Sequence, residues 1–465
     1  MNIFIIAAFI LYVTTLMSIG LHFYSQTKNA SDFIVGDRSV NYWVTAIATQ
    51  ASDMGSWLFL GFPAAVYTYG VFECWTAIGL VFFMFLNWQF VAPRLRQRTG
   101  NLKSLTLSSY FEEHFHDTTG GIRIISALLI LIFFTFYIAS GLVGIGRLFE
   151  LAFAINYHTG ILIGLSIGLL YTLIGGFIAV AWCDFFQGLF LLIMIVLVPA
   201  CAFFTITGIP AIMQAAQEKH ISTSLLSSPG EMIQALLLAC GWGLGYFGQP
   251  HILINFMGIK NQDHIPYAKY VGISWQILVL SASACAGLIA LAFFPEGLIN
   301  EELLFVKMAQ ELFHPFMIGL LICAILAATL STMDSHILVS GATLAQDIYK
   351  KLFNQHASSK RILLLSRIGS LFICLIALFI SWDGNSSIYT LVNYAWSGMG
   401  SAFGPVVIVS LYGKNITRQG ALAGFVAGGL VAALWPATTT NILPLIPGFS
   451  VGIITIYLVS YFTKK

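Results

Sequence analysis

The chain has 465 residues, of which 58% are hydrophobic and only 9% are charged. Soluble proteins carry about 25% charged residues, and the apolar residues here fall in blocks of around 20 or more, the length that crosses a bilayer. This composition excludes an ordinary soluble globular protein and predicts an all-α polytopic membrane protein. The formal net charge of +2 is small, so the positions of the charges are more informative than their sum.

Thirteen apolar stretches along the chain are predicted to span the membrane. The first has no basic start and no small-residue cleavage site, so we expect a spanning helix and not a removed signal peptide. Segment 297–311 is amphipathic and predicts a short helix in an outer loop. Several stretches exceed 25 residues, which indicates tilt or a break. The predicted spans are 2–22, 41–70, 73–94, 121–152, 158–175, 178–207, 231–256, 265–295, 312–346, 361–381, 387–413, 417–436 and 441–462.

The basic residues predict the orientation of these spans. Of the 21 lysines and arginines, 18 fall in alternate loops, and only Arg147, Lys219 and Lys307 fall on the other side. Loops rich in Lys and Arg stay in the cytoplasm. We therefore expect the N-terminus outside and the C-terminus inside, in a plasma membrane such as the inner membrane of a bacterium.

Two of the spans carry signs of an interrupted helix. Span 41–70 holds Asp53 among the small residues of Ala51–Ser56, and a charge at membrane depth costs from about 3 to more than 10 kcal/mol, so it is a functional hypothesis by default. Span 231–256 holds four glycines and a proline between Gly241 and Pro250. Interrupted spans at corresponding positions of two halves are typical of secondary transporters.

The two interrupted spans lie five spans apart, and because five is odd the halves that contain them would have opposite topology. The sequence therefore predicts one transmembrane transporter domain over 1–465. Its first inverted repeat would be 41–207 and its second 231–413, with peripheral helices at 1–22 and 417–462.

An unwound backbone near Asp53 would free carbonyl oxygens, and a hard cation such as Na⁺ is coordinated by several oxygens. Asp53 itself would help to bind the ion through a relay, or would instead cap the second half-helix. The half-helix that starts near Gly55 would point its positive end at the site, which suits an anionic group such as a carboxylate.

Span 312–346 supplies further polar candidates. Ser331 and Thr332 offer adjacent hydroxyl groups, and Ser335 follows on the same helix face as Ser331. Asp334 is a second candidate charge, unless it is solvated at the inner end of the span. Asp184 lies near the inner end of another span, either on a cation exit path or simply at the membrane interface.

Span 231–256 combines aromatic and polar residues in a pattern that suits a small-molecule site. A lone histidine such as His251 is more often a packing residue than a titrating one. The sequence has no GxxxxGK[ST] motif, no HExxH motif and no nucleophile–base pair, so it predicts neither an ATP-driven pump nor an intramembrane enzyme. The candidates in this span are Trp242, Tyr246, Gln249, Pro250 and His251.

Four motifs resemble those of the sodium/solute symporter family, and the resemblance covers nearly the whole chain. It implies a leucine-transporter-like core of two inverted five-helix repeats within about 13 transmembrane helices. The motifs are ATQASDMGSWLFLGFPAAVY (48–67), GWGLGYFGQPHI (241–252), LAATLSTMDSHILVSGATLAQDIYKK (326–351) and AWSGMGSAFGP (395–405).

The resemblance also implies roles for single residues. Asp53 matches an aspartate that is important for Na⁺ use, Asp184 matches an acidic position near the cation exit, and Arg38 matches an inner-loop arginine tied to function. The implied Na⁺ ligands are the carbonyl groups of Ala51, Met54 and Ala328 with the hydroxyl groups of Ser331 and Thr332. The implied substrate contacts are Ser56, Tyr137, Trp242, Tyr246, Gln249 and Pro250.

The function that the resemblance implies is Na⁺-driven uptake of a small organic solute, with proline or a related amino acid as the first expectation. The order Gly55-Ser56 is reversed relative to the proline-transporting pattern, and one residue turns a helical side chain by about 100°. Alternatives are another solute (a monocarboxylate, sugar or pantothenate), H⁺ coupling, or a membrane sensor. The expected partners are the solute, Na⁺ as coupling ion and the lipid bilayer, with no other cofactor, nucleic acid or obligate protein partner.

Overall fold

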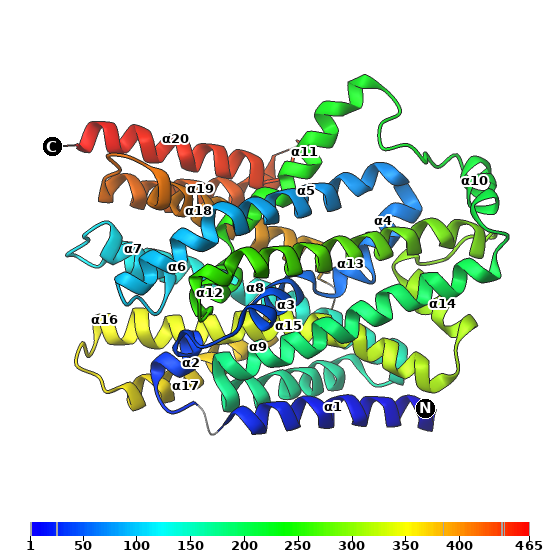
Figure 1. The fold of residues 1–465 in the computed structure, drawn as a ribbon, viewed down its shortest axis with the longest axis horizontal. Coiled ribbons are helices and arrows are strands. Elements are labelled where there is room, and N and C mark those ends of the chain that lie inside the picture. The colour runs from blue at the N-terminus through cyan, green and yellow to red at the C-terminus, as the bar shows by residue number, and fades with distance from the viewer. Residues whose placement is uncertain (1, 25–26, 385, 439, 441, 465) are drawn as a thin grey trace.

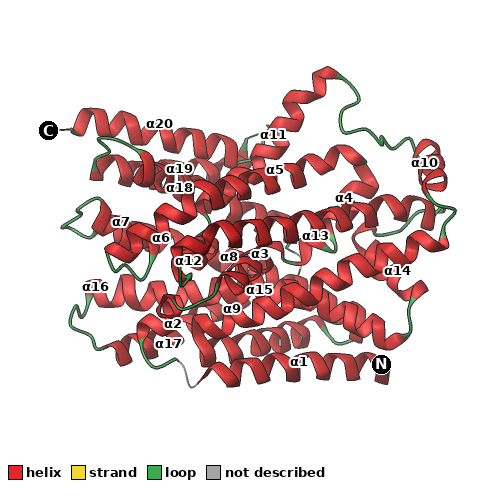
Figure 2. Cartoon of the chain, in the orientation of Figure 1, coloured by secondary structure: helices red, strands yellow, loops and turns green. Residues whose placement is uncertain are grey.

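The computed structural model describes the whole chain except residues 1, 25–26, 385, 439, 441 and 465. The described residues form helices joined by loops and contain no β-strand (Figure 2). An isolated backbone bridge joins Val40 to Ile259. The predicted all-α class is confirmed.

The helices run mostly side by side along the long axis of the molecule, and the two termini lie at opposite ends of that axis (Figure 1). Helix α14 (Leu304–Leu312) includes part of the predicted amphipathic helix 297–311. The first ten helices are α1 (Ile3–Tyr24), α2 (Ala30–Val35), α3 (Tyr42–Met54), α4 (Gly61–Tyr69), α5 (Cys74–Leu86), α6 (Ala92–Asn101), α7 (Leu107–His114), α8 (Gly121–Phe153), α9 (Tyr157–Thr205) and α10 (Ile209–Glu218). The others are α11 (Met232–Gly243), α12 (Pro250–Gly258), α13 (Ile265–Phe293), α14 (Leu304–Leu312), α15 (Pro315–Ala342), α16 (Lys350–Leu352), α17 (Ser359–Ile380), α18 (Ile388–Tyr412), α19 (Arg418–Leu434) and α20 (Leu445–Thr463).

Ten helical stretches in the described part of the chain are long and apolar enough to cross a membrane. Large apolar side chains are exposed on the peripheral helices, for example Ile10 on α1, Phe379 on α17 and Phe462 on α20. An exposed apolar surface of this kind is expected where lipid replaces water as the solvent. The chain is therefore a multi-pass membrane protein.

The helix in span 41–70 is interrupted, as predicted. Helix α3 ends at Met54, and Gly55 follows with φ 55° and ψ −168°. A 3₁₀ turn at Ser56–Leu58 leads to α4, which begins at Gly61. Only glycine adopts such a backbone conformation without strain, so Gly55 defines where the helix stops.

The helix in span 231–256 is interrupted as well. Helix α11 passes into a 3₁₀ segment at Leu244–Gly248, and Gln249 is extended before Pro250 starts α12. Pro250 suits a first helical position because its missing N–H would have no intrahelical partner there. A glycine is needed at position 248 because this segment packs closely against α18. A Cβ on Gly248 would lie 2.5 Å from the backbone nitrogen of Gly404 on α18.

Helix α9 is one continuous element over two predicted spans, 158–175 and 178–207. Gly176 inside it has non-helical torsion angles, φ 61° and ψ −158°, and so marks a kink between two helical parts. The predicted boundary between the two spans falls at this kink. The hydroxyl group of Thr27 donates to the Gly175 carbonyl at 2.7 Å. One carbonyl group beside the kink therefore has a hydrogen-bond partner outside the helix.

Helix α15 lies at the centre of the molecule. It packs against α1, α3, α8 and α9, and most of its residues from Ile318 onward are buried. Figure 1 places α3 and α8 near α15 in the middle of the bundle. Polar side chains on α15 are therefore enclosed by protein and not by lipid.

Candidate cation and solute site

The end of α3 and the middle of α15 meet through the oxygen atoms that were predicted as Na⁺ ligands. The Ser331 hydroxyl donates to the Ala51 carbonyl at 2.9 Å and lies 3.1 Å from the Ala328 carbonyl. The Thr332 hydroxyl donates to the same Ala328 carbonyl at 3.1 Å. The contact between α3 and α15 is close because Ala51 and Ala328 are small and fully buried.

Met54, the fifth predicted ligand residue, lines a small cavity together with Thr332. Carbonyl groups at the end of α3 lose their helical partners because the helix stops at Gly55. The carbonyl end of a helix also carries partial negative charge. The structure thus brings together five residues whose oxygen atoms suit a hard monovalent cation.

Asp53 belongs to a buried hydrogen-bond network that joins three segments. Its carboxylate accepts a hydrogen bond from the Tyr246 hydroxyl at 2.5 Å. The Gln276 side-chain amide donates to the same hydroxyl at 2.9 Å, and Gln50 donates to Gln276 at 3.4 Å. Asp53 thus connects α3 to the interrupted segment after α11, and its described contacts do not include a cap on the second half-helix, where no side-chain cap is found.

Gln50 and Gln276 were not predicted from the sequence as members of this network. Both side chains are fully buried within membrane-spanning segments. Buried amides require hydrogen-bond partners, and Gln50 lies one helical turn before Asp53. A search for uncharged polar residues near each intramembrane charge would have identified Gln50, whereas nothing local in the sequence connects Gln276 to it.

Two small cavities lie beside the interruption of α3. One, of about 50 Å³, is lined by Ser56 and Tyr137. The other, of about 40 Å³, is lined by Asp53, Tyr137 and Trp242. Pockets for organic ligands usually measure about 300–1,000 Å³, so a solute requires these walls to separate.

The other predicted substrate residues lie in different environments. Tyr246 contacts Asp53, as described above. The Gln249 amide donates to the Trp396 carbonyl at 3.1 Å, and its oxygen has no hydrogen-bond partner among the described residues. Pro250 instead lines a separate cavity of about 10 Å³ with Thr106, so the structure does not bring Pro250 to the two cavities beside α3.

Asp184 and Asp334 are buried between α9 and α15. Their exposed fractions are 1% and 0%, so the alternative of a solvated Asp334 is wrong, and Asp184 is likewise enclosed by protein. The Ser335 hydroxyl lies 3.4 Å from Asp184, and Tyr171 donates to Asp334. One oxygen of each carboxylate has no hydrogen-bond partner within the described chain.

His251 has a histidine partner, His336, with ring nitrogens 3.2 Å apart. The rings of His336 and Tyr137 also lie 4.3 Å apart between centroids. The His251 side chain is therefore part of a buried polar contact between α12 and α15. The role of His336 in this contact was not predicted from the sequence.

Arg38 joins the loop before α3 to the end of α6 and to the segment that follows it. Its guanidinium donates to the carbonyl groups of Thr99 at 2.9 Å and Ser104 at 2.8 Å. Asp37 and Arg38 both have positive φ angles, 47° and 54°, which indicates a tight turn held by these contacts. Arg38 is thus a structural connection between loops and lies outside the cation and solute residues.

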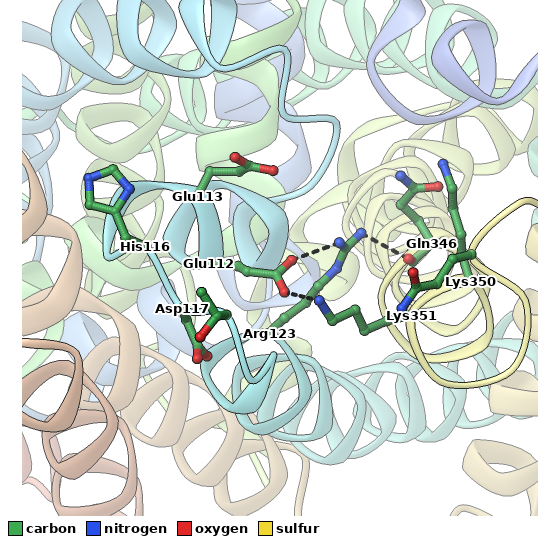
Figure 3. A pocket seen from close by; sticks show the side chains of 10 residues that line it. Glu112, Glu113, His116, Asp117, Arg123, Gln346, Lys350 and Lys351 are labelled. Atoms are coloured by element: carbon green, nitrogen blue, oxygen red, sulfur yellow. Dashed lines mark hydrogen bonds and ion pairs between the residues drawn. The ribbon is translucent and has the colours of Figure 1, made fainter.

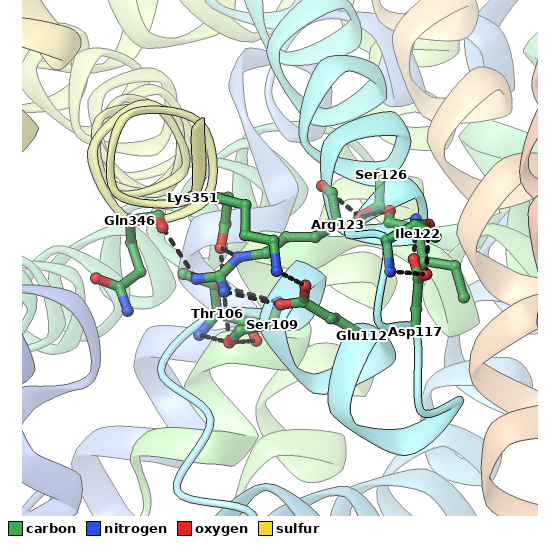
Figure 4. Close-up of polar contacts among 11 residues, drawn as sticks. Thr106, Ser109, Glu112, Asp117, Ile122, Arg123, Ser126, Gln346 and Lys351 are labelled. Carbon is green, nitrogen blue, oxygen red and sulfur yellow. Dashed lines mark hydrogen bonds and ion pairs between the residues drawn. The ribbon is translucent and has the colours of Figure 1, made fainter. Parts of the chain in front are cut away.

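A polar cavity of about 490 Å³ is lined by residues of α7 and α16, which lie toward the C-terminal end of the molecule in Figure 1, and Figure 3 shows its lining side chains. Arg123 at the start of α8 pairs with Glu112 and with Asp347, both at 2.9 Å, and Lys351 pairs with Glu112 at 2.5 Å (Figure 4). These ion pairs connect α7, α8 and the end of the α15 span. No residue of the predicted cation or solute site lines this cavity.

Known proteins resemble the chain in sequence over almost its whole length. It is 41% identical to sodium/proline symporter 2 of Staphylococcus saprophyticus, over 98% of this chain and 92% of that protein. It is 38% identical to the high-affinity proline transporter PutP of Bacillus subtilis, over 97% and 96%. It is also 38% identical to the sodium/proline symporter of Escherichia coli, over 99% and 93%.

Solved structures of transporters share the fold. A Na⁺-coupled sialic acid symporter matches with a TM-score of 0.84 at 18% identity, over 99% of this chain and 98% of that chain. MhsT, solved in complex with L-phenylalanine, matches with a TM-score of 0.53 at 13% identity, over 91% and 98%. The family model described as sodium:solute symporter family matches residues 33–446. The chain therefore belongs to the sodium:solute symporter family, whose members are transporters and not enzymes.

Proposed function

We propose that the protein couples the inward flux of Na⁺ to the uptake of proline by alternating access. The proteins named as proline transporters support this substrate, because they are 38–41% identical over nearly the full chain. The observation that carries the mechanism is the contact between the Ser331 hydroxyl and the Ala51 carbonyl. It joins the interrupted helix α3 to the central helix α15 through a hydroxyl oxygen and a carbonyl oxygen.

The proposed Na⁺ ligands are the oxygen atoms at this contact. They are the carbonyl groups of Ala51, Met54 and Ala328 and the hydroxyl groups of Ser331 and Thr332. A hydroxyl group can rotate, so Ser331 can present its lone pairs to a cation and give up its donated hydrogen bond. An ion held by both helices would favour the arrangement in which α3 and α15 are adjacent.

The proposed solute site lies at the interruptions of α3 and α11. The aromatic rings of Tyr137 and Trp242 line its cavities and suit the apolar ring of proline. The free N–H groups of the second half-helix, after Gly55, suit a carboxylate. Asp53 and Tyr246 connect the two interruptions, so occupation of the site would affect both helices. Ser56 and Gln249 complete the proposed contacts, and Pro250 would act by starting α12.

The buried carboxylates of Asp184 and Asp334 are proposed to take part in cation coupling together with Ser335. Each carboxylate keeps one oxygen without a hydrogen-bond partner in the part of the chain that the structure describes. An unpartnered buried oxygen is costly unless a cation or proton satisfies it. H⁺ coupling is the alternative that these two residues keep open.

We further propose thirteen membrane crossings built on two inverted repeats, 41–207 and 231–413. Ten stretches meet the criteria of length and hydropathy. Helix α9 counts as two crossings because of its kink at Gly176, and the two interrupted spans, whose halves are too short to count alone, add two more. An odd number of crossings agrees with termini at opposite ends of the bundle (Figure 1).

The proposed orientation has the N-terminus outside and the C-terminus in the cytoplasm. Helices α7 and α16, near several of the predicted inner basic residues, lie toward the C-terminal end in Figure 1. Lys219 directly follows α10, and Lys307 lies in α14. Both helices lie toward the other end in Figure 1. With this orientation the membrane potential contributes about 2.3 kcal/mol per charge per 100 mV to cation entry. Arg38 would then stabilise the cytoplasmic loops.

Uptake of labelled proline into proteoliposomes tests this proposal. We expect an inward Na⁺ gradient, but not a K⁺ gradient at the same pH, to drive accumulation. The double variant Ser331→Ala/Thr332→Ala should lose the Na⁺ stimulation at equal reconstitution. Equal uptake with K⁺ would contradict Na⁺ coupling, and preference for another amino acid or a carboxylate in a competition panel would contradict proline.

A further inference from the structure

An apolar groove of about 480 Å³ runs between α5 and α13 on the outside of the bundle. The two helices pack against each other and are visible together in Figure 1. Lining residues such as Phe82 and Ile277 are 55% and 46% exposed, so the groove faces the lipid. Small residues, Ala77 and Ala284, leave the space between the larger side chains.

The groove is as long as the hydrocarbon layer of one membrane leaflet. Its lining extends from Cys74 to Phe85 on α5 and from Ile273 to Ala284 on α13. At 1.5 Å per residue, each wall is about 17 Å long. The hydrocarbon core of a bilayer is about 30 Å thick, so one leaflet contributes about 15 Å. An extended acyl chain fits these dimensions.

A buried cation lies at one end of the groove. Lys269 is one helical turn before Ile273, and its Nζ atom is 4.9 Å from the centroid of the Phe85 ring. The residue is only 6% exposed. Its Nζ atom donates to Gln89 at 2.6 Å and lies 4.4 Å from the ring centroid of Tyr270.

None of the ion pairs found among the described residues involves Lys269. Its partners are a neutral amide and two aromatic rings. An ammonium group offers three donors, and a partly desolvated cation without an anion is energetically unfavourable. Among the described residues, Lys269 therefore has no carboxylate partner within ion-pair distance.

Aromatic side chains indicate that this end lies at the level of lipid headgroups. Tyr267 and Tyr270 are both 61% exposed, and Trp43 is 50% exposed. Tyr42 lies between two of these side chains, since the centroid of its ring is 5.5 Å from that of Trp43 and 5.9 Å from that of Tyr267. Tyrosine and tryptophan gather at membrane–water interfaces.

We infer that the groove binds an anionic phospholipid, with one acyl chain between α5 and α13 and the phosphate paired with Lys269. The groove supplies apolar surface along one leaflet, and the lysine supplies the charge that selects the headgroup. A zwitterionic lipid has its own cation beside the phosphate and gains less from Lys269. The site is independent of the cation and solute site, so its test does not depend on transport.

Native mass spectrometry and thermal unfolding of the full-length protein in detergent test the headgroup. The probes are phosphatidylglycerol and phosphatidylcholine with identical acyl chains. We expect phosphatidylglycerol to bind about fivefold more tightly, the gain expected for one lysine near an anionic surface. Lys269→Gln should remove this preference, whereas Lys269→Arg should keep it. The matched control Lys260→Gln changes an exposed lysine and should also keep the preference.

A second pair of variants tests the acyl chain. Ser281→Trp places an indole in the groove and should weaken binding of both lipids severalfold. Ile193→Trp changes a 60% exposed residue on α9 and should leave binding unchanged. Wild-type phosphatidylglycerol binding in Lys269→Gln, or an equal loss in Lys260→Gln, would overturn the headgroup assignment. Wild-type binding in Ser281→Trp would overturn the groove assignment.

Discussion

At Gly55 the backbone leaves α3 with torsion angles that are essentially restricted to glycine. A Cβ atom here would meet no close neighbour, since the nearest atom within reach is the Thr332 hydroxyl oxygen at 3.7 Å. The effect of Gly55→Ala should therefore come from the backbone, with a cost of about 1–3 kcal/mol. We expect a lower unfolding temperature and loss of Na⁺-stimulated uptake.

The matched control for this prediction is Gly429→Ala on α19. Its added Cβ would also meet neighbours no closer than 3.5 Å, but Gly429 lies inside a regular helix with an ordinary φ. This variant should change the unfolding temperature little. An unfolding temperature and Na⁺ response of Gly55→Ala equal to those of the wild type would contradict a glycine-dependent interruption.

The Tyr246 hydroxyl has two roles in one network, because it donates to Asp53 and accepts from Gln276. Tyr246→Phe removes both bonds and leaves two buried polar groups without that partner, at about 1–3 kcal/mol each. We expect the Na⁺ concentration for half-maximal uptake to rise, because Asp53 loses its connection to the interrupted segment after α11. Na⁺ titration of uptake measures this.

Tyr110→Phe is the control, since that hydroxyl is also buried and donates to Ser410 at 3.1 Å, away from α3. It should lower stability but leave the Na⁺ dependence of uptake unchanged. If both phenylalanine variants shift the Na⁺ titration equally, the network around Asp53 has no specific role in cation coupling.

At the scale of elements, Asp117 fixes the start of α8. Its carboxylate accepts from the backbone N–H of Ile122 at 2.7 Å (Figure 4). It also accepts from Thr119, and from Arg418 at 3.2 Å. Partial burial raises the pKa of Asp117, but these hydrogen bonds and the arginine charge lower it by more. The pKa of Asp117 therefore lies below its usual value. The negative charge is also favourable at a helix N-terminus.

A group with a lowered pKa in the folded state contributes stability above its unfolded pKa, about 3.9 for aspartate, and loses it as the pH falls through the folded pKa. We expect Asp117→Asn to unfold at a lower temperature than wild type at pH 7. The difference should shrink as the pH falls below about 3.9. Thermal unfolding across pH measures it, and a difference that is constant down to pH 2.5 would contradict an ionised cap.

The positions of the interruptions could be predicted from the sequence. Glycine, proline and one charge in an apolar stretch are local signals, and they identified the ends of α3 and α11. The boundary predicted between spans 158–175 and 178–207 also falls at the Gly176 kink of α9. The contact of α3 with Ser331 was predicted only through the family resemblance. Nothing in the residues of one helix states which face another helix will cover.

Long-range partners were not predictable for the same reason. Tyr246 and Asp53 are 193 residues apart, and Arg123 and Asp347 are 224 residues apart. Their pairing depends on the register of whole helices, and a rotation of one residue, about 100°, would separate the side chains. His336 was overlooked because its partner His251 also lies on a distant segment.

At the scale of the whole molecule, Na⁺ should behave as a ligand that holds α3 and α15 together. A ligand that binds only the folded state stabilises it by RT ln(1 + [L]/Kd), about 2.7 kcal/mol at one hundred times Kd. We expect the unfolding temperature to rise with NaCl and not with KCl at equal ionic strength. The double variant Ser331→Ala/Thr332→Ala should lose this response.

Proline should then stabilise the protein more in the presence of Na⁺ than in its absence, because the coupling between two ligands is reciprocal. Conversely, proline should lower the Na⁺ concentration that gives half of the thermal shift, by the same factor. The interrupted helix α3 supplies both proposed sites, the carbonyl groups of Ala51 and Met54 for the ion and the segment after Gly55 for the solute. Independent shifts from Na⁺ and proline, without mutual enhancement, would mean that this shared helix does not couple them.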